Sequence, residues 1–246
     1  MVVHSTGSQW GSPAERGGGS QTGGAAASAS PAFGFKQVVD DFHRLYYDQA
    51  DTTWRNTYFL GVPVQKCPFD LWIYQELLYE LRPDLVVEAG TYKGGSALYL
   101  ASMLDLLGHG RVVTIDVSDL PGRPEHPRIT YLLGSSVDPE ILATVTDLAR
   151  GSSMVLVILD SDHSAEHVER ELHAYAPLVS LGSYLVVEDG NINGRPVLEG
   201  FGPGPGEAVD SFLARSNEFV PDRSREKFFM SFNPGGYLRR ISGGPL

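Results

Sequence analysis

Apolar residues along the chain follow two patterns, a helical spacing and short continuous runs. From Phe35 to Tyr47 they recur every three or four positions, which predicts a helix, and Phe69 to Leu81 predicts a second helix that ends before Pro83. Five runs rich in Val, Ile and Leu predict strands at 85–88, 111–116, 129–133, 155–159 and 184–187. Further helices are expected at 95–107, after Asp138 and Pro139, at 164–175 and at 207–215.

This alternation predicts an α/β fold with a doubly wound, mostly parallel sheet. Strands with nearly continuous apolar residues are typical of a sheet that helices cover on both faces. Two last segments, 227–232 and 237–241, are joined by the turn residues Asn233-Pro234-Gly235-Gly236, which predict a β-hairpin. We therefore expect a Rossmann-like methyltransferase fold, whose sheet ends in a β-hairpin, with N-terminal helices.

Composition divides the chain into three parts. Residues 1–32 are mostly Gly, Ser and Ala, and such a segment buries too little apolar area to offset its ordering entropy, so we expect a disordered tail. Residues 33–83 are expected to form a helical cap, and residues 84–246 a cofactor-binding core. The Gly- and Pro-rich stretch Gly190–Gly206 is a candidate lid over the site.

Charge and cysteine content exclude several classes of protein. The formal net charge of -11 disfavours nucleic acid as a partner. The single cysteine, Cys67, excludes an internal disulfide and a cysteine-based zinc site. There is no apolar run of the ~20 residues that would span a bilayer, and the first residues do not resemble a secretory signal. We expect a soluble, cytoplasmic protein without a membrane partner.

A glycine-rich turn lies between the first predicted strand and its helix. Gly90, Gly94 and Gly95 would let the backbone approach a ligand and adopt positive φ, although tight packing of strand on helix would also explain them. The spacing is not that of a P-loop, because no Lys-Ser or Lys-Thr follows. It also departs from the Gly-x-Gly-x-x-Gly of dinucleotide sites.

Polar residues at the ends of the first three strands extend this turn into a candidate cofactor site. Glu88 could accept a hydrogen bond from an amino or hydroxyl group, and Asp116 stands where an acid commonly holds ribose hydroxyls, with a strand-end cap as the alternative. Ser135 and Ser136 could flank an adenine ring. The expected cofactor-binding residues are Glu88, Gly90, Thr91, Gly94, Gly95, Ser96, Asp116, Ser135 and Ser136.

Carboxylates follow the fourth and fifth strands. Asp160, Glu188 and Asp189 would repel one another without a cation, and Mg²⁺ prefers such oxygen ligands; the alternative is that Glu188 and Asp189 cap a loop. His163 should overhang the same crevice and suits a general base. These features predict a methyltransferase that uses S-adenosylmethionine and Mg²⁺, with Asp160 and His163 as catalytic residues.

The chain also resembles the cephalosporin hydroxylase family, which includes rhamnosyl O-methyltransferases of glycolipid and antibiotic pathways. The resemblance runs from about Trp54 to Ile241. It rests on the motifs Gly61-Val62-Pro63, Asp70-Leu71-Trp72, Gln75-Glu76, Glu88-Ala89-Gly90-Thr91, Gly94-Gly95-Ser96, Leu159-Asp160-Ser161-Asp162-His163-Ser164, Glu188-Asp189, Glu226-Lys227-Phe228 and Asn233-Pro234-Gly235-Gly236-Tyr237-Leu238. It implies binding of S-adenosylmethionine, Mg²⁺ held at Asp160, Glu188 and Asp189, and assembly into homo-oligomers.

The expected activity is O-methylation of a small hydroxylated molecule. The favoured acceptor is a sugar on a secondary metabolite or glycolipid. An iron(II) oxygenase would need two histidines and a carboxylate around one ion. The only His-x-Glu is His167-Val168-Glu169, and its only downstream histidine, His173, lies on the same predicted helix. Two alternatives stay open: a non-catalytic partner of a separate oxygenase, and a nicotinamide oxidoreductase, which the glycine spacing disfavours.

Overall fold

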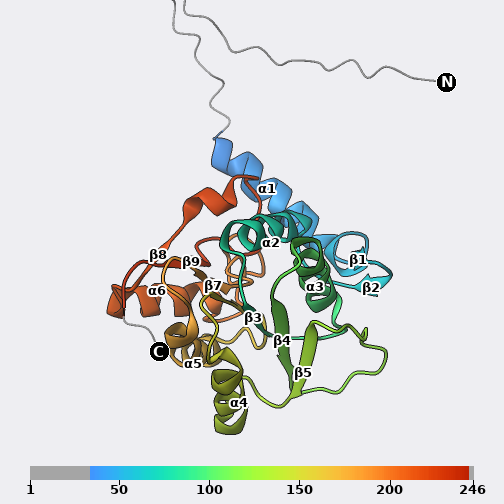
Figure 1. Ribbon diagram of the computed structural model, residues 1–246. Helices are drawn as coiled ribbons and strands as arrows, with labels where there is room; N and C mark the ends of the chain where they lie inside the picture. Colours follow the sequence, from blue (N-terminus) through green and yellow to red (C-terminus); the bar gives the residue numbers. More distant parts are fainter. Residues whose placement is uncertain (1–33, 244–246) are drawn as a thin grey trace, which may run out of the picture. The chain divides into compact units, whose positions relative to one another are not determined.

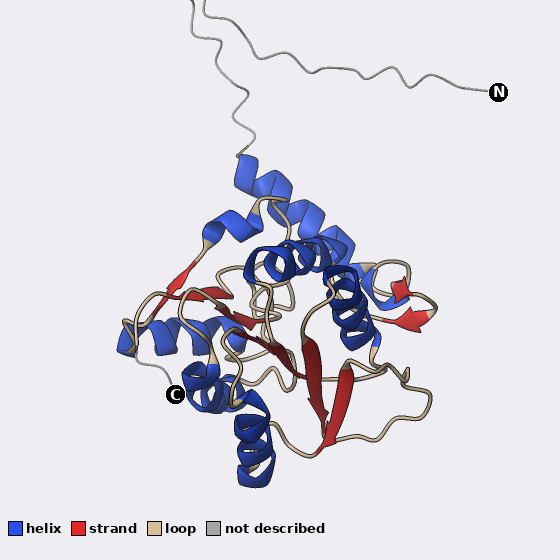
Figure 2. Ribbon diagram, viewed as in Figure 1, coloured by secondary structure: helices blue, strands red, loops and turns tan. Residues whose placement is uncertain are grey.

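The computed structural model describes residues 34–243, whose helices and strands form a three-layer α/β arrangement (Figures 1 and 2). The tail predicted at residues 1–32 lies outside this range. From Gly34 on, the chain forms one compact unit that includes the N-terminal helices, so the division at residues 33–83 and 84–246 stays a prediction. Among the described residues, the structure contains no helix with both the length and the apolar content needed to cross a bilayer.

A seven-stranded sheet forms the middle layer, with the order β5-β4-β3-β6-β7-β9-β8. The first five strands of that order are parallel, whereas β9 is antiparallel to both β7 and β8. The strands are β3 (Leu85–Ala89), β4 (Arg111–Asp116), β5 (Ile129–Leu133), β6 (Val155–Leu159), β7 (Tyr184–Val187), β8 (Phe219–Pro221) and β9 (Tyr237–Arg240). This arrangement confirms the predicted Rossmann-like sheet.

Helices cover both faces of the sheet, as the continuous apolar strands predict (Figure 1). One face packs on α2 (Pro68–Leu81) and α3 (Gly95–Leu107), through core residues such as Leu77 and Leu100. The other face packs on α4 (Pro139–Ala149), α5 (Ala165–Tyr175) and α6 (Pro205–Arg215). Helix α1 (Phe35–Asp48) precedes a short segment with a 3₁₀ turn at Trp54–Asn56 and the two-stranded pair β1 (Tyr58–Phe59) and β2 (Val62–Pro63).

The predicted hairpin of 227–232 with 237–241 is wrong in its first strand. The strand that pairs with β9 is β8, at Phe219–Pro221, and residues 227–232 are not a strand. Their polar groups instead bind α2: the Ser231 hydroxyl and the Phe232 amide donate to Asp70 at 2.6 and 2.8 Å. The Phe232 ring lies among the rings of α1 and Trp54, so this segment serves the core rather than the sheet.

Candidate functional site

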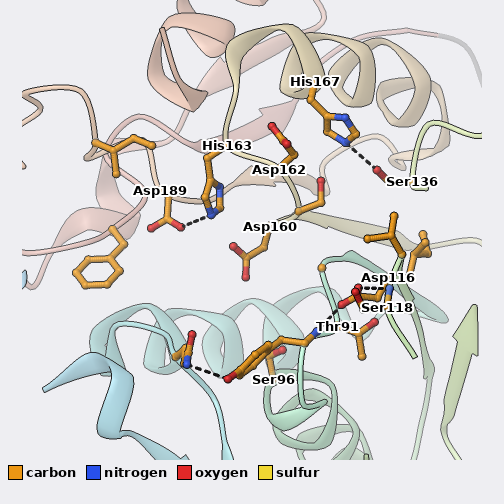
Figure 3. Close-up of a pocket in the computed structure, with 18 of the residues that line it drawn as sticks. Thr91, Ser96, Asp116, Ser118, Ser136, Asp160, Asp162, His163, His167 and Asp189 are labelled. Carbon is orange, nitrogen blue, oxygen red and sulfur yellow. Dashed lines mark hydrogen bonds and ion pairs between the residues drawn. The ribbon is translucent and has the colours of Figure 1, made fainter. Parts of the chain in front are cut away.

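A cavity of about 650 Å³ opens at the carboxyl ends of the parallel strands (Figure 3). Nine of the residues expected to bind cofactor or metal, or to act in catalysis, line it: Gly90, Thr91, Ser96, Asp116, Ser135, Ser136, Asp160, His163 and Asp189. Glu88, Gly94, Gly95 and Glu188 do not line it. The fold thus brings the ends of five strands to one crevice, as their parallel order requires.

The glycines of the turn after β3 are explained first by packing. A Cβ on Gly90 would lie 1.8 Å from the backbone oxygen of Asp160, and one on Gly95 would lie 2.1 Å from the backbone oxygen of Pro63. Gly90 and Gly94 both have positive φ. These glycines therefore let β3 approach β6 and let α3 approach β2, and of the three only Gly90 also faces the cavity.

Asp116 at the end of β4 holds the same turn in place. Its carboxylate accepts hydrogen bonds from the amides of Tyr92 at 2.7 Å and Ser118 at 2.8 Å, and Arg123 lies 3.3 Å away. Glu88 lies beneath the turn, fully buried, and accepts from the Thr114 hydroxyl at 2.7 Å. Burial raises the pKa of Glu88, and the nearby charge of Lys66 opposes that shift.

An acidic group with one histidine lies at the ends of β6 and β7. Ligand atoms of Asp160, His163 and Asp189 lie within 4.8 Å of one another, the separation expected of residues that share a cation. His163 Nε2 lies 3.2 Å from Asp189 Oδ2, and Asp160 points into the space beneath this pair (Figure 3). Asp189 has a φ of 55°, a sparsely populated conformation for a residue other than glycine that is typical of functional sites.

Lys66, which the sequence patterns did not single out, bridges Asp160 of this group and the neighbouring Glu188. Its side chain is 2% exposed, and its ammonium contacts Asp160 Oδ2 at 2.5 Å and Glu188 Oε1 at 2.6 Å. Burial disfavours the charged ammonium, but the carboxylates around it outweigh that effect and raise the pKa of Lys66. The lysine is therefore a fixed internal cation that joins the ends of β6 and β7.

Glu188 is turned toward this interior rather than toward the cavity. Besides Lys66, the Tyr74 hydroxyl donates to the same oxygen, Oε1, at 2.6 Å, and the residue is 5% exposed. Burial raises the pKa of both Glu188 and Asp160, and the ammonium of Lys66 opposes each shift. The role of Glu188 as a metal ligand stays a prediction. In that role its second oxygen, Oε2, would bind the ion.

A second polar group lies along the cavity on α5. His167 lines the cavity, with Nε2 3.1 Å from the Ser136 hydroxyl and 3.5 Å from Glu171 Oε1. The Ser161 hydroxyl donates to the same Glu171 oxygen at 2.6 Å, and Glu171 is fully buried. Bonding to Glu171 raises the pKa of His167. The sequence analysis gave His167 no role in the site.

The other side of the cavity is apolar. Tyr47, Trp54 and Phe232 line it together with three residues of the predicted lid, Ile192, Leu198 and Phe201. The lid segment is ordered by its own contacts: Val197 donates its amide to Asn191 at 3.1 Å, and Arg195 pairs with Glu207 and Asp210. Its opening or closing stays a prediction.

Comparison with known proteins gives consistent matches along most of the chain. The family model described as "Rhamnosyl O-methyltransferase/CmcI" matches residues 51–241. The chain is 41% identical over 210 residues to the rhamnosyl O-methyltransferases of Mycobacterium bovis BCG and M. tuberculosis H37Rv, covering 82% of this chain and 85% of each relative. The M. leprae rhamnosyl O-methyltransferase is 37% identical over 209 residues, covering 82% of this chain and 90% of that protein.

Solved structures show the same fold. A structure of CmcI described as holding Mg and SAM superposes with a TM-score of 0.59 at 22% identity, covering 76% of this chain and 78% of that one. An apo structure of CmcI gives 0.58 at 23% identity, covering 77% and 78%.

Proposed function

Because the chain belongs to the rhamnosyl O-methyltransferase/CmcI family, we propose that it transfers the methyl group of S-adenosylmethionine to a hydroxyl group of a sugar, with Mg²⁺ as a second cofactor. The observation that carries the proposal is the meeting of Asp160, His163 and Asp189 in a cavity whose other end is built from the β3, β4 and β5 turns. The expected acceptor is a glycosylated small molecule, such as a secondary metabolite or glycolipid.

The cofactor is proposed to lie along the ends of β3 to β5. Asp116 would face its ribose hydroxyls, Ser135 and Ser136 its adenine ring, and Gly90, Thr91 and Ser96 the rest of the molecule. The turn that carries these groups is proposed to be held in place by Glu88, Gly94 and Gly95, which lie outside the cavity lining. The serines and Asp116 form a mostly polar rim, which suits a nucleoside.

The donor set at β6 and β7 fits a hard divalent cation. Asp160, Glu188 and Asp189 are the proposed ligands; Lys66 occupies one oxygen of each of the first two, so their second oxygens are left for the ion. A bound Mg²⁺ would supply Lewis-acid chemistry, which would lower the pKa of an acceptor hydroxyl held beside these residues.

His163 is the proposed general base. Its imidazole lines the cavity, and the Asp189 carboxylate 3.2 Å from Nε2 would stabilise the protonated ring that has received the hydroxyl proton. The residues of this chain would otherwise contribute mainly by holding the hydroxyl oxygen in line with the cofactor methyl group. Ile192, Leu198 and Phe201 would exclude water from that path.

Calorimetric titration with S-adenosylmethionine and S-adenosylhomocysteine, with and without Mg²⁺ and with NADH as comparator, tests the cofactor class. Selective binding of the two adenosyl ligands is expected, whereas binding of neither would overturn the proposal.

Asp160→Ala should abolish methyl transfer and leave S-adenosylhomocysteine binding largely intact. Adenosyl binding without transfer to any glycoside would instead favour an accessory role. Homo-oligomeric assembly stays a prediction, which light scattering of the purified protein would test.

A further inference from the structure

The segment 233–236 packs along the end of β7, where the acidic residues of the site leave the sheet. A Cβ on Gly236 would lie 2.1 Å from the Val187 backbone oxygen, and one on Gly190 would lie 3.1 Å from the Pro234 backbone oxygen. The sequence predicts only a turn for this segment, and its close contact with the end of β7 indicates a second role.

Three alternate amides at the end of β7 donate hydrogen bonds to residues 232–236. The amides of Val187 and Asn191 donate to backbone oxygens of that segment at 2.9 and 3.2 Å. Between them, the amide of Asp189 donates to a side-chain oxygen, Asn233 Oδ1, at 3.3 Å. The side chain of Asn233 therefore takes the place of a backbone oxygen at the point where Asp189 turns out of the strand.

Asp189 depends on such a contact because its backbone has left the strand conformation. Its φ of 55° is sparsely populated for a residue other than glycine, and it persists only where neighbouring groups hold it. From this backbone the carboxylate extends toward His163 (Figure 3). Asn233 is itself fixed, since it is fully buried and its backbone amide donates to the Ser231 hydroxyl at 2.9 Å.

The other end of the Asn233 amide reaches Tyr74, which bonds to Glu188. Asn233 Nδ2 donates to the Tyr74 hydroxyl oxygen at 3.3 Å, and that hydroxyl donates to Glu188 Oε1 at 2.6 Å. Because the Asp189 amide can only donate, Oδ1 must face it and Nδ2 must face Tyr74, so the Tyr74 proton is directed to Glu188. Burial raises the pKa of Tyr74 well above its usual range, so the hydroxyl keeps this proton.

We propose that Asn233 and Tyr74 are positioning residues for the metal ligands Glu188 and Asp189. One buried amide holds the backbone of Asp189 and, through the phenol of Tyr74, the carboxylate of Glu188. Groups that orient ligands in this way strengthen metal binding because the ligands do not have to be ordered when the ion arrives. Neither residue lines the cavity, so neither would touch substrate. The inference rests on the proposed function for the identity of the ligands, and adds the residues that orient them.

The test is binding of Mn²⁺ to the full chain, measured from the electron paramagnetic resonance signal of the free ion. Mn²⁺ takes the same oxygen ligands as Mg²⁺. Tyr74→Phe removes one hydroxyl and should weaken Mn²⁺ binding about 10-fold, and Asn233→Ala should weaken it by about 10- to 100-fold. Affinity for S-adenosylhomocysteine should change little in both variants, because the adenosyl ligand is proposed to bind at the ends of β3 to β5.

Tyr184→Phe is the matched control for Tyr74→Phe. Tyr184 is 2% exposed against 1% for Tyr74, and its hydroxyl also donates to a carboxylate at 2.6 Å. The acceptor is Asp222 and not a proposed ligand. Urea unfolding should show a loss of stability in both variants, whereas Mn²⁺ binding should weaken only in Tyr74→Phe. A purely structural role of Tyr74 would not produce that difference.

Mn²⁺ binding that is unchanged in Tyr74→Phe, or weakened equally by Tyr184→Phe, would overturn the proposal. If Asn233→Ala does not fold, the comparison of the two tyrosine variants still decides. The unmodified chain is measured first. Absence of Mn²⁺ binding there would contradict the metal in the proposed function and this inference with it, whereas normal binding with unaffected variants would contradict the positioning role alone.

Discussion

Replacing Lys66 by methionine removes the one ammonium group that joins Asp160 to Glu188 and keeps a side chain of similar length. The ammonium lies 2.5 Å from Asp160 and 2.6 Å from Glu188, and its side chain is 2% exposed. Removing one partner of a buried ion pair leaves an uncompensated charge and costs about 3–5 kcal/mol. We expect Lys66→Met to lower the free energy of unfolding of the metal-free protein by that amount.

Urea unfolding in EDTA, followed by circular dichroism and tryptophan fluorescence, measures this loss. For a slope of about 2–3 kcal/mol/M, the midpoint should fall by roughly 1–2.5 M urea. Lys227→Met is a matched control: Lys227 contacts Glu76 at the same 2.6 Å, but its side chain is 46% exposed. An exposed pair contributes about 0–1 kcal/mol, so the control should move the midpoint little.

A second substitution separates the charge effect from lost packing. Adding Glu188→Gln to Lys66→Met removes one of the two uncompensated carboxylates, and should return about 1–2 kcal/mol of the lost free energy of unfolding. If Lys66→Met costs no more than Lys227→Met, or if the added Glu188→Gln makes the protein less stable still, Lys66 does not act as the counter-ion of these acids.

Three further predictions concern Asp70, Gly90 and His163. Burial raises the pKa of Asp70 to about 6, so the stability that its protonated form contributes is lost as pH rises from about 4 through 6. Relative to Asp70→Asn, the unmodified chain should lose about 2–3 kcal/mol of unfolding free energy between pH 4 and 7 in urea titrations. Gly90→Ala should prevent stable folding, because its Cβ would lie 1.8 Å from a backbone oxygen, whereas Gly151→Ala, at φ 79° in open space, should cost only about 1 kcal/mol by the same assay. His163→Gln should lower the rate of methyl transfer at least ~100-fold in a single-turnover assay and leave the Kd of S-adenosylhomocysteine within about threefold. The opposite result in any of the three would refute the role given to that residue.

The central sheet could be predicted from the sequence largely because β3, β4, β6 and β7 are buried on both faces. Continuous apolar runs gave β4 to β7 their observed bounds, and β3 is only one residue longer than predicted. The last pair failed for a physical reason. Strand β8 has three residues, ends in a proline and buries only Phe219, so its sequence shows no strand pattern. The apolar residues at 228–232 belong instead to a segment that contacts α1 and α2.

The candidate site was predictable only as far as strand ends determine it. Asp160 and Asp189 meet because parallel strands end at one edge, and their position follows directly from the chain order. Lys66 lies in a loop, 19 residues before β3. Its neighbours in the sequence do not distinguish it from a lysine on the protein surface. Trp54 and Phe232 meet at the cavity from opposite ends of the chain, so only the tertiary structure brings them together.

Lys66 also affects where a cation would bind in this crevice. Burial is the largest cause that raises the pKa of each of four neighbouring acids, Glu88, Asp160, Glu188 and Asp189, so their charged forms are disfavoured by burial. The ammonium of Lys66 contacts one oxygen of Asp160 and one of Glu188, and of the four acids only Asp160 and Asp189 line the cavity. An additional positive charge is therefore most stabilising on the cavity side, beside Asp160 and Asp189, where it would also meet the hydroxyl of an acceptor. We therefore expect a metal ion to bind on the cavity side of these acids, away from the ammonium of Lys66.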